Sequence, residues 1–173
     1  DEWIRSRTGI GARHVVGEKE SLGELCGQAS ERALAMAGWD AESLDLILLA
    51  TSTPDDLFGS APRLQARIGA GNAVAFDLTA ACSGFLFALV TASQFLRTGA
   101  MKRVLVVGAD QLSRWVDWDD RRSCVLFGDA AAAVVLEASD DGQDDLQGFL
   151  VRSDGSRGEV LQLPQISDHD PLI

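Results

Sequence analysis

Cys82 lies in a segment whose residue types favour nucleophilic chemistry. A short apolar run, Ala73–Phe76, leads through small residues to the cysteine, and a longer apolar stretch begins at about Ser83. This pattern is typical of a strand–turn–helix unit that presents a nucleophile at the end of a sheet. The positive end of a helix dipole favours the thiolate, and backbone N–H groups there can bind a developing oxyanion. A small buried hydrophobic residue is the alternative for an unpaired cysteine.

The other residues able to do thiol or acid–base chemistry are few. Cys26 and Cys124 lie in apolar surroundings, which predicts that both pack in the core. The three cysteines are widely spaced with no CxxC pair, so neither a disulfide framework nor a zinc site is indicated. His14 and His169 lie in polar stretches and are predicted at the surface. The residues alone therefore give a nucleophile without a base.

Strand-like and helix-like patterns alternate around Cys82. Ser21 and Glu24 have capping-box spacing, which predicts a helix that begins at Ser21 and ends at Gly38. The other elements expected before residue 108 are helices over 62–68 and 83–96 and buried strands over 46–50, 73–76 and 103–107. The 83–96 helix is apolar around most of its circumference, so it is expected inside the protein. Buried strands that alternate with helices predict a mostly parallel sheet covered by helices.

The pattern changes after Gly128. Residues 130–137 and 146–152 look like two strands, and the acidic segment 140–145 between them indicates a solvated turn. We therefore expect a hairpin in this part of the chain. The acidic turn is interpreted as surface charge rather than as a metal site.

The composition is that of an ordinary folded domain. The chain has 173 residues, 46% of them hydrophobic and 24% charged, and no apolar run is long enough to cross a membrane. A net charge of −11 argues against a nucleic acid partner. The chain begins at Asp1 without methionine and ends in a loop-like segment, so we expect residues 1–173 to be one incomplete domain. Unpaired thiols favour the cytoplasm, with the plastid stroma as an alternative.

Several short motifs occur in an order and spacing that resemble one enzyme family. They are Asp1-Glu2-Trp3-Ile4 with Arg7-Thr8-Gly9-Ile10, Ala80–Phe85, Val106–Asp110, Asp120-Arg121, Phe127-Gly128-Asp129, and Ser153–Ser156 with Gly158-Glu159. Together they resemble β-ketoacyl-acyl-carrier-protein synthase III, of the thiolase-like superfamily. The resemblance implies a five-layered αβαβα fold of two similar halves, of which this chain is the N-terminal half. It also implies an active homodimer.

The resemblance implies a two-stage reaction at Cys82. The cysteine takes an acyl group from acetyl-CoA or another short acyl-CoA, and the acyl-enzyme then condenses with malonyl-acyl carrier protein with loss of carbon dioxide. Trp3 and Arg121 match the pair that sandwiches the adenine of CoA, and Arg7 matches a residue near the CoA phosphates. A stacked ring and local cations would let an acidic protein hold an anionic substrate. No metal and no permanently bound cofactor are implied.

The resemblance also assigns three apolar side chains to the acyl pocket. Leu112 and Phe127 match residues that line it, and Phe58 matches a residue that closes the pocket of the partner subunit. All three would equally suit an ordinary core.

Two departures from the family pattern limit what this chain can do. The catalytic histidine and asparagine of the family belong to motifs of its C-terminal half, and neither motif occurs here. We therefore expect that residues 1–173 alone could be acylated but would not condense. Arg122 also stands where related sequences often have glycine. The alternatives are an acyltransferase that uses an oxygen or nitrogen nucleophile, and a non-catalytic module that binds CoA or assembles with other proteins.

Overall fold

The sheet of this protein is mixed and mostly parallel, as predicted. A computed structural model describes residues 2–140 and 144–162. Its four strands are β1 (Leu46–Ala50), β2 (Val74–Leu78), β3 (Arg103–Gln111) and β4 (Asp129–Glu137), in the spatial order β2-β1-β3-β4. β1 pairs in parallel with β2 and β3, and β4 pairs antiparallel with β3.

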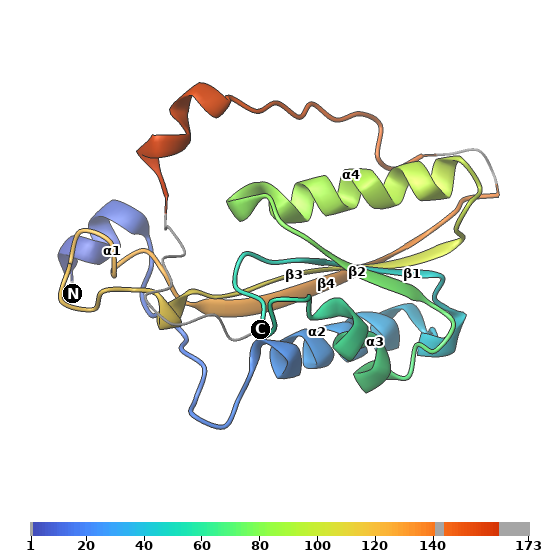
Figure 1. Cartoon of the computed structure of the whole chain (residues 1–173), viewed down its shortest axis with the longest axis horizontal. Coiled ribbons are helices and arrows are strands. Elements are labelled where there is room, and N and C mark those ends of the chain that lie inside the picture. The colour runs from blue at the N-terminus through green and yellow to red at the C-terminus, as the bar shows by residue number, and fades with distance from the viewer. Residues whose placement is uncertain (1, 141–143, 163–173) are drawn as a thin grey trace.

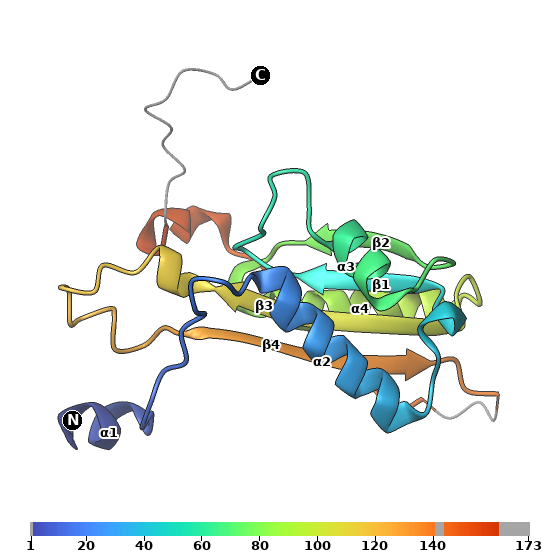
Figure 2. The same cartoon turned by 90° about the horizontal axis from the view of Figure 1, so that it is seen from below.

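Helices cover both faces of the sheet. α2 (Leu22–Ala37) and α3 (Ala61–Ile68) lie on one face and α4 (Gly84–Arg97) on the other, while α1 (Glu2–Thr8) lies beyond one end of the sheet (Figures 1 and 2). Short 3-10 turns are η1 (Ala41–Ser43), η2 (Ala81–Ser83), η3 (Leu112–Arg114) and η4 (Gly155–Val160). Within the described ranges, no helix has both the length and the apolarity that a membrane crossing requires.

The two central strands carry the core on both sides. All five residues of β1 are buried: Ile47 and Leu49 belong to the cluster under α2 and α3, and Leu48 belongs to the cluster under α4. Leu105 and Val106 of β3 alternate in the same way. The prediction that these apolar runs form strands buried on both faces is confirmed.

The predicted ends of α2 and α3 are confirmed. The N–H of Glu24 donates to the Ser21 side chain at 3.2 Å, and Gly38 ends α2 with φ at 69°. Gly69 ends α3 in the same left-handed conformation, which glycine adopts without a Cβ penalty. The second half of the capping box is wrong, because the Glu24 carboxylate accepts hydrogen bonds from Gln28 and from Arg67 of α3 instead.

Two predictions of complete burial are wrong in the described chain. β2 is the outermost strand, so Val74 is 54% exposed and Phe76 is 39% exposed. α4 buries only the face toward the sheet, where Ala88 and Ala92 lie, and Leu86 on another face is 59% exposed. The sheet can cover only one side of a helix, and the apolar circumference of α4 exceeds that side.

The predicted hairpin after Gly128 is also wrong. β4 forms over 129–137, but residues 144–152 form no strand, and β4 pairs with β3 instead. The Arg97 guanidinium of α4 holds this segment through the Asp144 carboxylate and the Leu146 carbonyl, both at 2.7 Å. Residues 141–143 of the expected turn, together with Asp1 and the end of the chain from 163, lie outside the described residues.

Replacing Asp45 should weaken the fold in a pH-dependent way. Its carboxylate, at the start of β1, accepts the N–H groups of Arg103 and Lys102 at 2.9 and 2.7 Å, and these bonds hold the pKa of Asp45 below its usual value. In the whole protein, Asp45→Asn should lower the free energy of unfolding at pH 7 by about 1 kcal/mol, measured by urea unfolding.

The sign of the pH effect follows from the lowered pKa. The carboxylate stabilises the fold above its ordinary pKa of 3.8, and the benefit is lost as the pH falls toward the depressed folded value. The difference between the wild type and Asp45→Asn should therefore shrink toward about pH 3. A difference that is constant over this range would contradict the assignment.

Candidate active site

The carboxyl ends of three parallel strands meet at one edge of the sheet. Ala50 at the end of β1 pairs with Leu78 of β2 and with Gly108 of β3. Cys82 follows β2 by four residues, in the segment that connects the carboxyl end of β2 to the start of α4. Figure 1 shows that this segment crosses from the sheet to the face covered by α4. Sites in parallel sheets are commonly built at this edge.

A strained turn presents Cys82. Ala81 has φ at 47°, the one described residue other than glycine with a positive φ, and this conformation costs an alanine about 1–2 kcal/mol. The side chain of Cys82 is exposed. The start of α4 packs closely on β1, since a Cβ at Gly84 would lie 3.4 Å from the Ala50 Cβ. The structure therefore provides the strand–turn–helix unit expected from the sequence, and the buried alternative does not fit the described chain.

A network centred on Asp110 joins the ends of β1 and β3. One oxygen of its carboxylate accepts the Ser52 N–H at 2.8 Å and the hydroxyls of Thr53 and Thr51 at 3.1 and 3.3 Å. The Ser52 hydroxyl lies 3.4 Å from that of Thr79, which precedes Cys82 by three residues. This network was not predicted, although three hydroxyl residues directly after a buried strand are a recognisable signal for a polar sheet edge.

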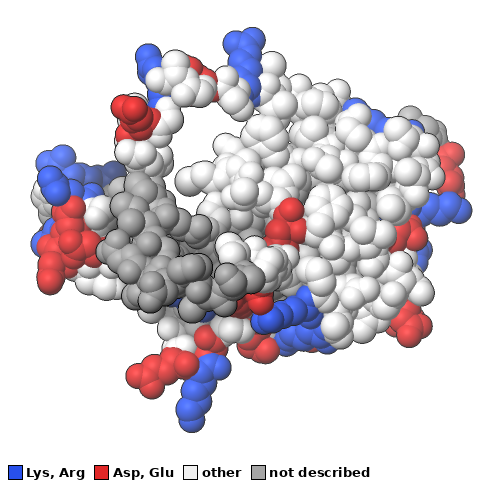
Figure 3. All heavy atoms as spheres, in the orientation of Figure 1, with Lys and Arg blue, Asp and Glu red and all other residues white. Residues whose placement is uncertain are grey.

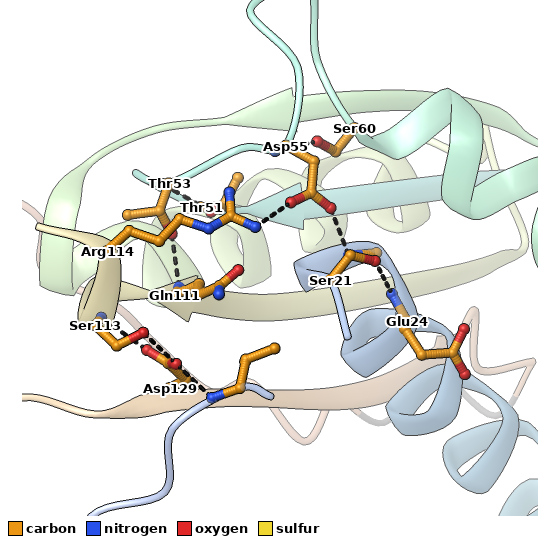
Figure 4. Close-up of polar contacts among 12 residues, drawn as sticks. Ser21, Glu24, Thr51, Thr53, Asp55, Ser60, Gln111, Ser113, Arg114 and Asp129 are labelled. Atoms are coloured by element: carbon orange, nitrogen blue, oxygen red, sulfur yellow. Dashed lines mark hydrogen bonds and ion pairs between the residues drawn. The ribbon is translucent and has the colours of Figure 1, made fainter. Parts of the chain in front are cut away.

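Asp129 fixes the segment after α1 against the end of β3 (Figure 4). Its carboxylate accepts the Ser113 N–H at 2.8 Å, the Ser113 hydroxyl at 2.6 Å and the Val16 N–H at 2.8 Å. Burial raises the pKa of Asp129, but the bonds from Ser113 and Val16 outweigh it and hold the pKa below its ordinary value. Leu112 and Phe127, both half-buried, are thus anchored by their neighbours in sequence.

Asp55 ties the loop after β1 to α2 and to η3 (Figure 4). Its carboxylate accepts the Gly23 N–H at 2.8 Å and pairs with Arg114 at 3.1 Å. The Asp55 N–H in turn donates to the Ser60 hydroxyl at 3.0 Å. These contacts attach the middle of the loop to α2 and η3 and join it to Ser60 at the loop's end.

The expected CoA-binding residues lie at one end of the molecule. Trp3 is 54% exposed on α1, and the Arg7 guanidinium carbon lies 4.9 Å from the centre of its ring, within range of a cation–π contact. Arg121 is exposed on the segment 115–128, which lies at the same end as α1 in both views (Figures 1 and 2). The neighbouring Arg122 pairs with the Asp120 carboxylate at 2.9 Å.

Phe58 is exposed beside a groove. It is 83% exposed and lines a groove of about 600 Å³ together with Thr79 and Phe76. Leu112 and Phe127 are not among the lining residues of this groove.

Two of the remaining candidates lie where the sequence predicted. Cys26 is fully buried and His14 is exposed. Cys124 is only half-buried and lies in a turn rather than in a core cluster, so the prediction of core packing is not met there. His169 lies outside the described residues. Within 2–140 and 144–162, no group of three His, Cys, Asp or Glu side chains could hold a metal ion.

Comparisons with known sequences agree on one family. Residues 76–155 match the family of 3-oxoacyl-[acyl-carrier-protein (ACP)] synthase III. All 173 residues align at 70% identity with 51% of a protein of Prochlorococcus marinus (strain MIT 9313) named beta-ketoacyl-[acyl-carrier-protein] synthase III. A protein of the same name from Synechococcus sp. (strain RCC307) is 69% identical over 52% of its length. The chain thus spans about half the length of the curated relatives it matches.

Solved structures agree with the sequence matches. The 3-oxoacyl-(acyl carrier protein) synthase III of Pseudomonas aeruginosa PAO1 matches with a TM-score of 0.90 at 41% identity, over 97% of this chain and 53% of that one. The synthase III of Thermus thermophilus matches with a TM-score of 0.89 at 38% identity, over 99% and 53%. The predicted thiolase-like fold, N-terminal half only, is confirmed.

Cys82 and Cys26 should differ strongly in reactivity. Burial, with smaller contributions from the Asp55 and Asp77 charges, raises the pKa of Cys26 to about 12, so roughly one thiol in ten thousand is ionised at pH 8. In the native whole protein, iodoacetamide should alkylate Cys82 and leave Cys26 unmodified, as peptide mass mapping would measure. Denatured protein is the control, in which both should react. Equal labelling of the two cysteines in the native protein would contradict the burial seen here.

Proposed function

The chain belongs to the β-ketoacyl-[acyl-carrier-protein] synthase III family, and from this premise we propose that the whole protein is a condensing enzyme of type II fatty acid biosynthesis. Residues 1–173 would be its N-terminal thiolase-like domain. The observation that carries the proposal is the exposed thiol of Cys82, which follows the strained Ala81 at the start of α4. The family match includes this segment.

Cys82 would act first as a nucleophile and then as a leaving group. Its thiolate attacks the carbonyl carbon of a short acyl-CoA such as acetyl-CoA, a new thioester forms on the sulfur, and CoA leaves as its thiol after taking up a proton. Loss of carbon dioxide from malonyl-acyl carrier protein then generates a carbanion that attacks the acyl group. The Cys82 thiolate departs, and a 3-oxoacyl-acyl carrier protein is released. The histidine and asparagine that assist the second stage in this family would come from the rest of the protein.

Trp3, Arg7 and Arg121 would hold CoA. Trp3 offers a half-exposed ring, and Arg7 already lies over that ring. In the proposed complex, the adenine stacks between Trp3 and Arg121 and Arg7 lies near the phosphates. These local cations would offset the net charge of −11, which otherwise repels an anionic substrate. Leu112 and Phe127 would line the acyl pocket.

A homodimer would complete the site, with β2 at its interface. β2 is the sheet edge next to Phe58, and the exposed apolar residues of this region include Val74, Phe76, Leu57 and Phe58. Uncharged side chains cover most of the face seen in Figure 3, although acidic side chains interrupt this area. Pairing of two such edges would satisfy their backbone groups and carry Phe58 toward the pocket of the partner. We place the enzyme in the cytoplasm, with the plastid stroma as an alternative.

Loss of the Cys82 thiol should abolish acyl transfer. The whole protein incubated with radiolabelled acetyl-CoA should retain label on Cys82, and Cys82→Ser should lose it, since the acyl acceptor is gone. Cys26→Ser is the matched control and should keep the label.

The second stage separates the candidate activities. With malonyl-acyl carrier protein, only condensation releases carbon dioxide, whereas transfer to an oxygen or nitrogen nucleophile consumes the acyl-enzyme without it. A Cys82→Ser protein that still acquires covalent label would remove Cys82 as the nucleophile. A wild-type protein that binds CoA but is never acylated would support a non-catalytic module instead.

Replacing Trp3 should weaken CoA binding. Stacking of a base on an aromatic ring is worth about 1–3 kcal/mol, so Trp3→Ala should raise the KM for acetyl-CoA by a factor of about 5 to 150. Trp39→Ala is the matched control, because Trp39 also lies under an arginine, Arg103 at 4.7 Å, but has no proposed ligand. An unchanged KM in Trp3→Ala, or an equal rise in Trp39→Ala, would remove Trp3 from the CoA site.

A further inference from the structure

We propose that Asp77 is a positioning residue that sets acyl-chain selectivity by fixing the loop that carries Phe58 against the strand that leads to Cys82. The inference rests on the proposed function and adds a residue to it. Asp77 is part of β2 and lies five residues before Cys82. Its carboxylate contacts Ser60 and Ala61, just after Phe58 in the chain. One side chain therefore joins the loop that carries Phe58 to the strand that leads to Cys82.

Three backbone contacts converge on the Asp77 carboxylate. Oδ2 accepts the Ser60 N–H at 2.8 Å, and Oδ1 lies 3.0 Å from the same nitrogen. Oδ1 also accepts the Ala61 N–H at 2.6 Å. Ser60 is 4% exposed and Ala61 is fully buried, so these contacts are shielded from water. Hydrogen bonds from N–H groups to a carboxylate are about twice as strong as those between neutral groups.

The carboxylate replaces the usual cap of α3. Ser60 is the N-cap residue of this helix, yet its hydroxyl makes no cap hydrogen bond and instead accepts the Asp55 N–H at 3.0 Å. The first N–H groups of a helix need an acceptor, and negative charge is favoured there. Asp77 supplies both from a neighbouring strand, so the start of α3 is tied to β2 as well as to its own loop.

The position of Phe58 depends on this attachment. The Phe58 N–H donates to the Asp56 carboxylate at 2.9 Å, and the Gly59 N–H donates to the Asp56 carbonyl at 3.1 Å, so the turn is closed just before Ser60. Gly59 has φ at 101° and passes directly over Asp77, since a Cβ there would lie 3.4 Å from the Asp77 Cγ. A shift of the Ser60 backbone would therefore move Phe58 with it.

The same carboxylate faces the groove beside the nucleophile strand. Asp77, Phe58 and Thr79 all line the groove of about 600 Å³ described above, and Thr79 is three residues before Cys82. Asp77 thus sits between the exposed phenyl ring and the segment that delivers the thiol, without reaching the thiol itself. In the proposed dimer, the ring borders the acyl pocket of the partner, so Asp77 controls pocket depth through Phe58.

The test is a double-substitution experiment on the whole enzyme. The kcat/KM ratio of hexanoyl-CoA to acetyl-CoA should change about tenfold or more in Asp77→Ala, the scale at which altered apolar pockets discriminate acyl chains. Phe58→Ala should change the same ratio. The double variant should show the ratio of Phe58→Ala alone, because Asp77 acts through that ring.

Asp45 is the control that distinguishes an effect on the position of Phe58 from a general loss of stability. Asp45 also accepts two backbone N–H groups, but at the amino-terminal ends of β1 and β3. Asp45→Ala should lower the melting temperature and leave the ratio unchanged. If Asp77→Ala lowers kcat/KM equally for every acyl-CoA, as a purely structural residue would, the proposal is wrong. An unchanged ratio in Phe58→Ala overturns it equally.

Two further variants cover the case in which Asp77→Ala does not fold. Asp77→Asn keeps the size and one acceptor and should shift the ratio less than alanine does. Gly59→Ala leaves Asp77 in place but strains the turn, and it should shift the ratio as well. If neither variant moves the ratio, the proposal fails. A wild-type enzyme that no acyl-CoA acylates would refute the proposed function itself, which is a separate result.

Discussion

Carboxylates that accept backbone N–H groups from other segments hold this structure together at the ends of its strands. Asp45 does so at the start of β1, Asp77 on β2, Asp110 at the end of β3 and Asp129 at the start of β4. Each satisfies donors that the sheet or a helix leaves unpaired. The acidic character of the chain is therefore partly structural, because these charges fix the loops from which the proposed site is built.

The sequence predicts well whatever depends on local pattern. The apolar run of β1 implies burial on both faces, and Gly38 and Gly69 imply helix ends because they tolerate the left-handed backbone. The turn that carries Cys82 is predictable because it lies between a strand pattern and a helix pattern. The positive φ of Ala81 is not predictable, since alanine has no intrinsic preference for it.

Individual contacts between distant residues were missed, and the burial of β2 and α4 was predicted wrongly. The Asp77–Ser60 contact joins residues 17 apart and the Val16–Asp129 contact joins residues 113 apart, and no spacing rule links them. The apolar residues around α4 indicate that its burial is favourable. They do not indicate which element would cover each side of the helix. The same holds for β2, whose apolar residues include Phe76 at the edge of this sheet.

The buried Cys26 and the exposed Cys82 should differ in their sensitivity to oxidation. Peroxide oxidises thiolates, and a thiol with a pKa of about 12 offers almost none at neutral pH. Cys82, in contrast, is exposed to solvent. Peroxide would therefore reach Cys82 before Cys26, and the sulfenic acid formed on Cys82 would block the proposed acyl transfer while the core around Cys26 stays intact. A sulfenic acid is reversible, so a reductant would restore the thiol without replacement of the protein.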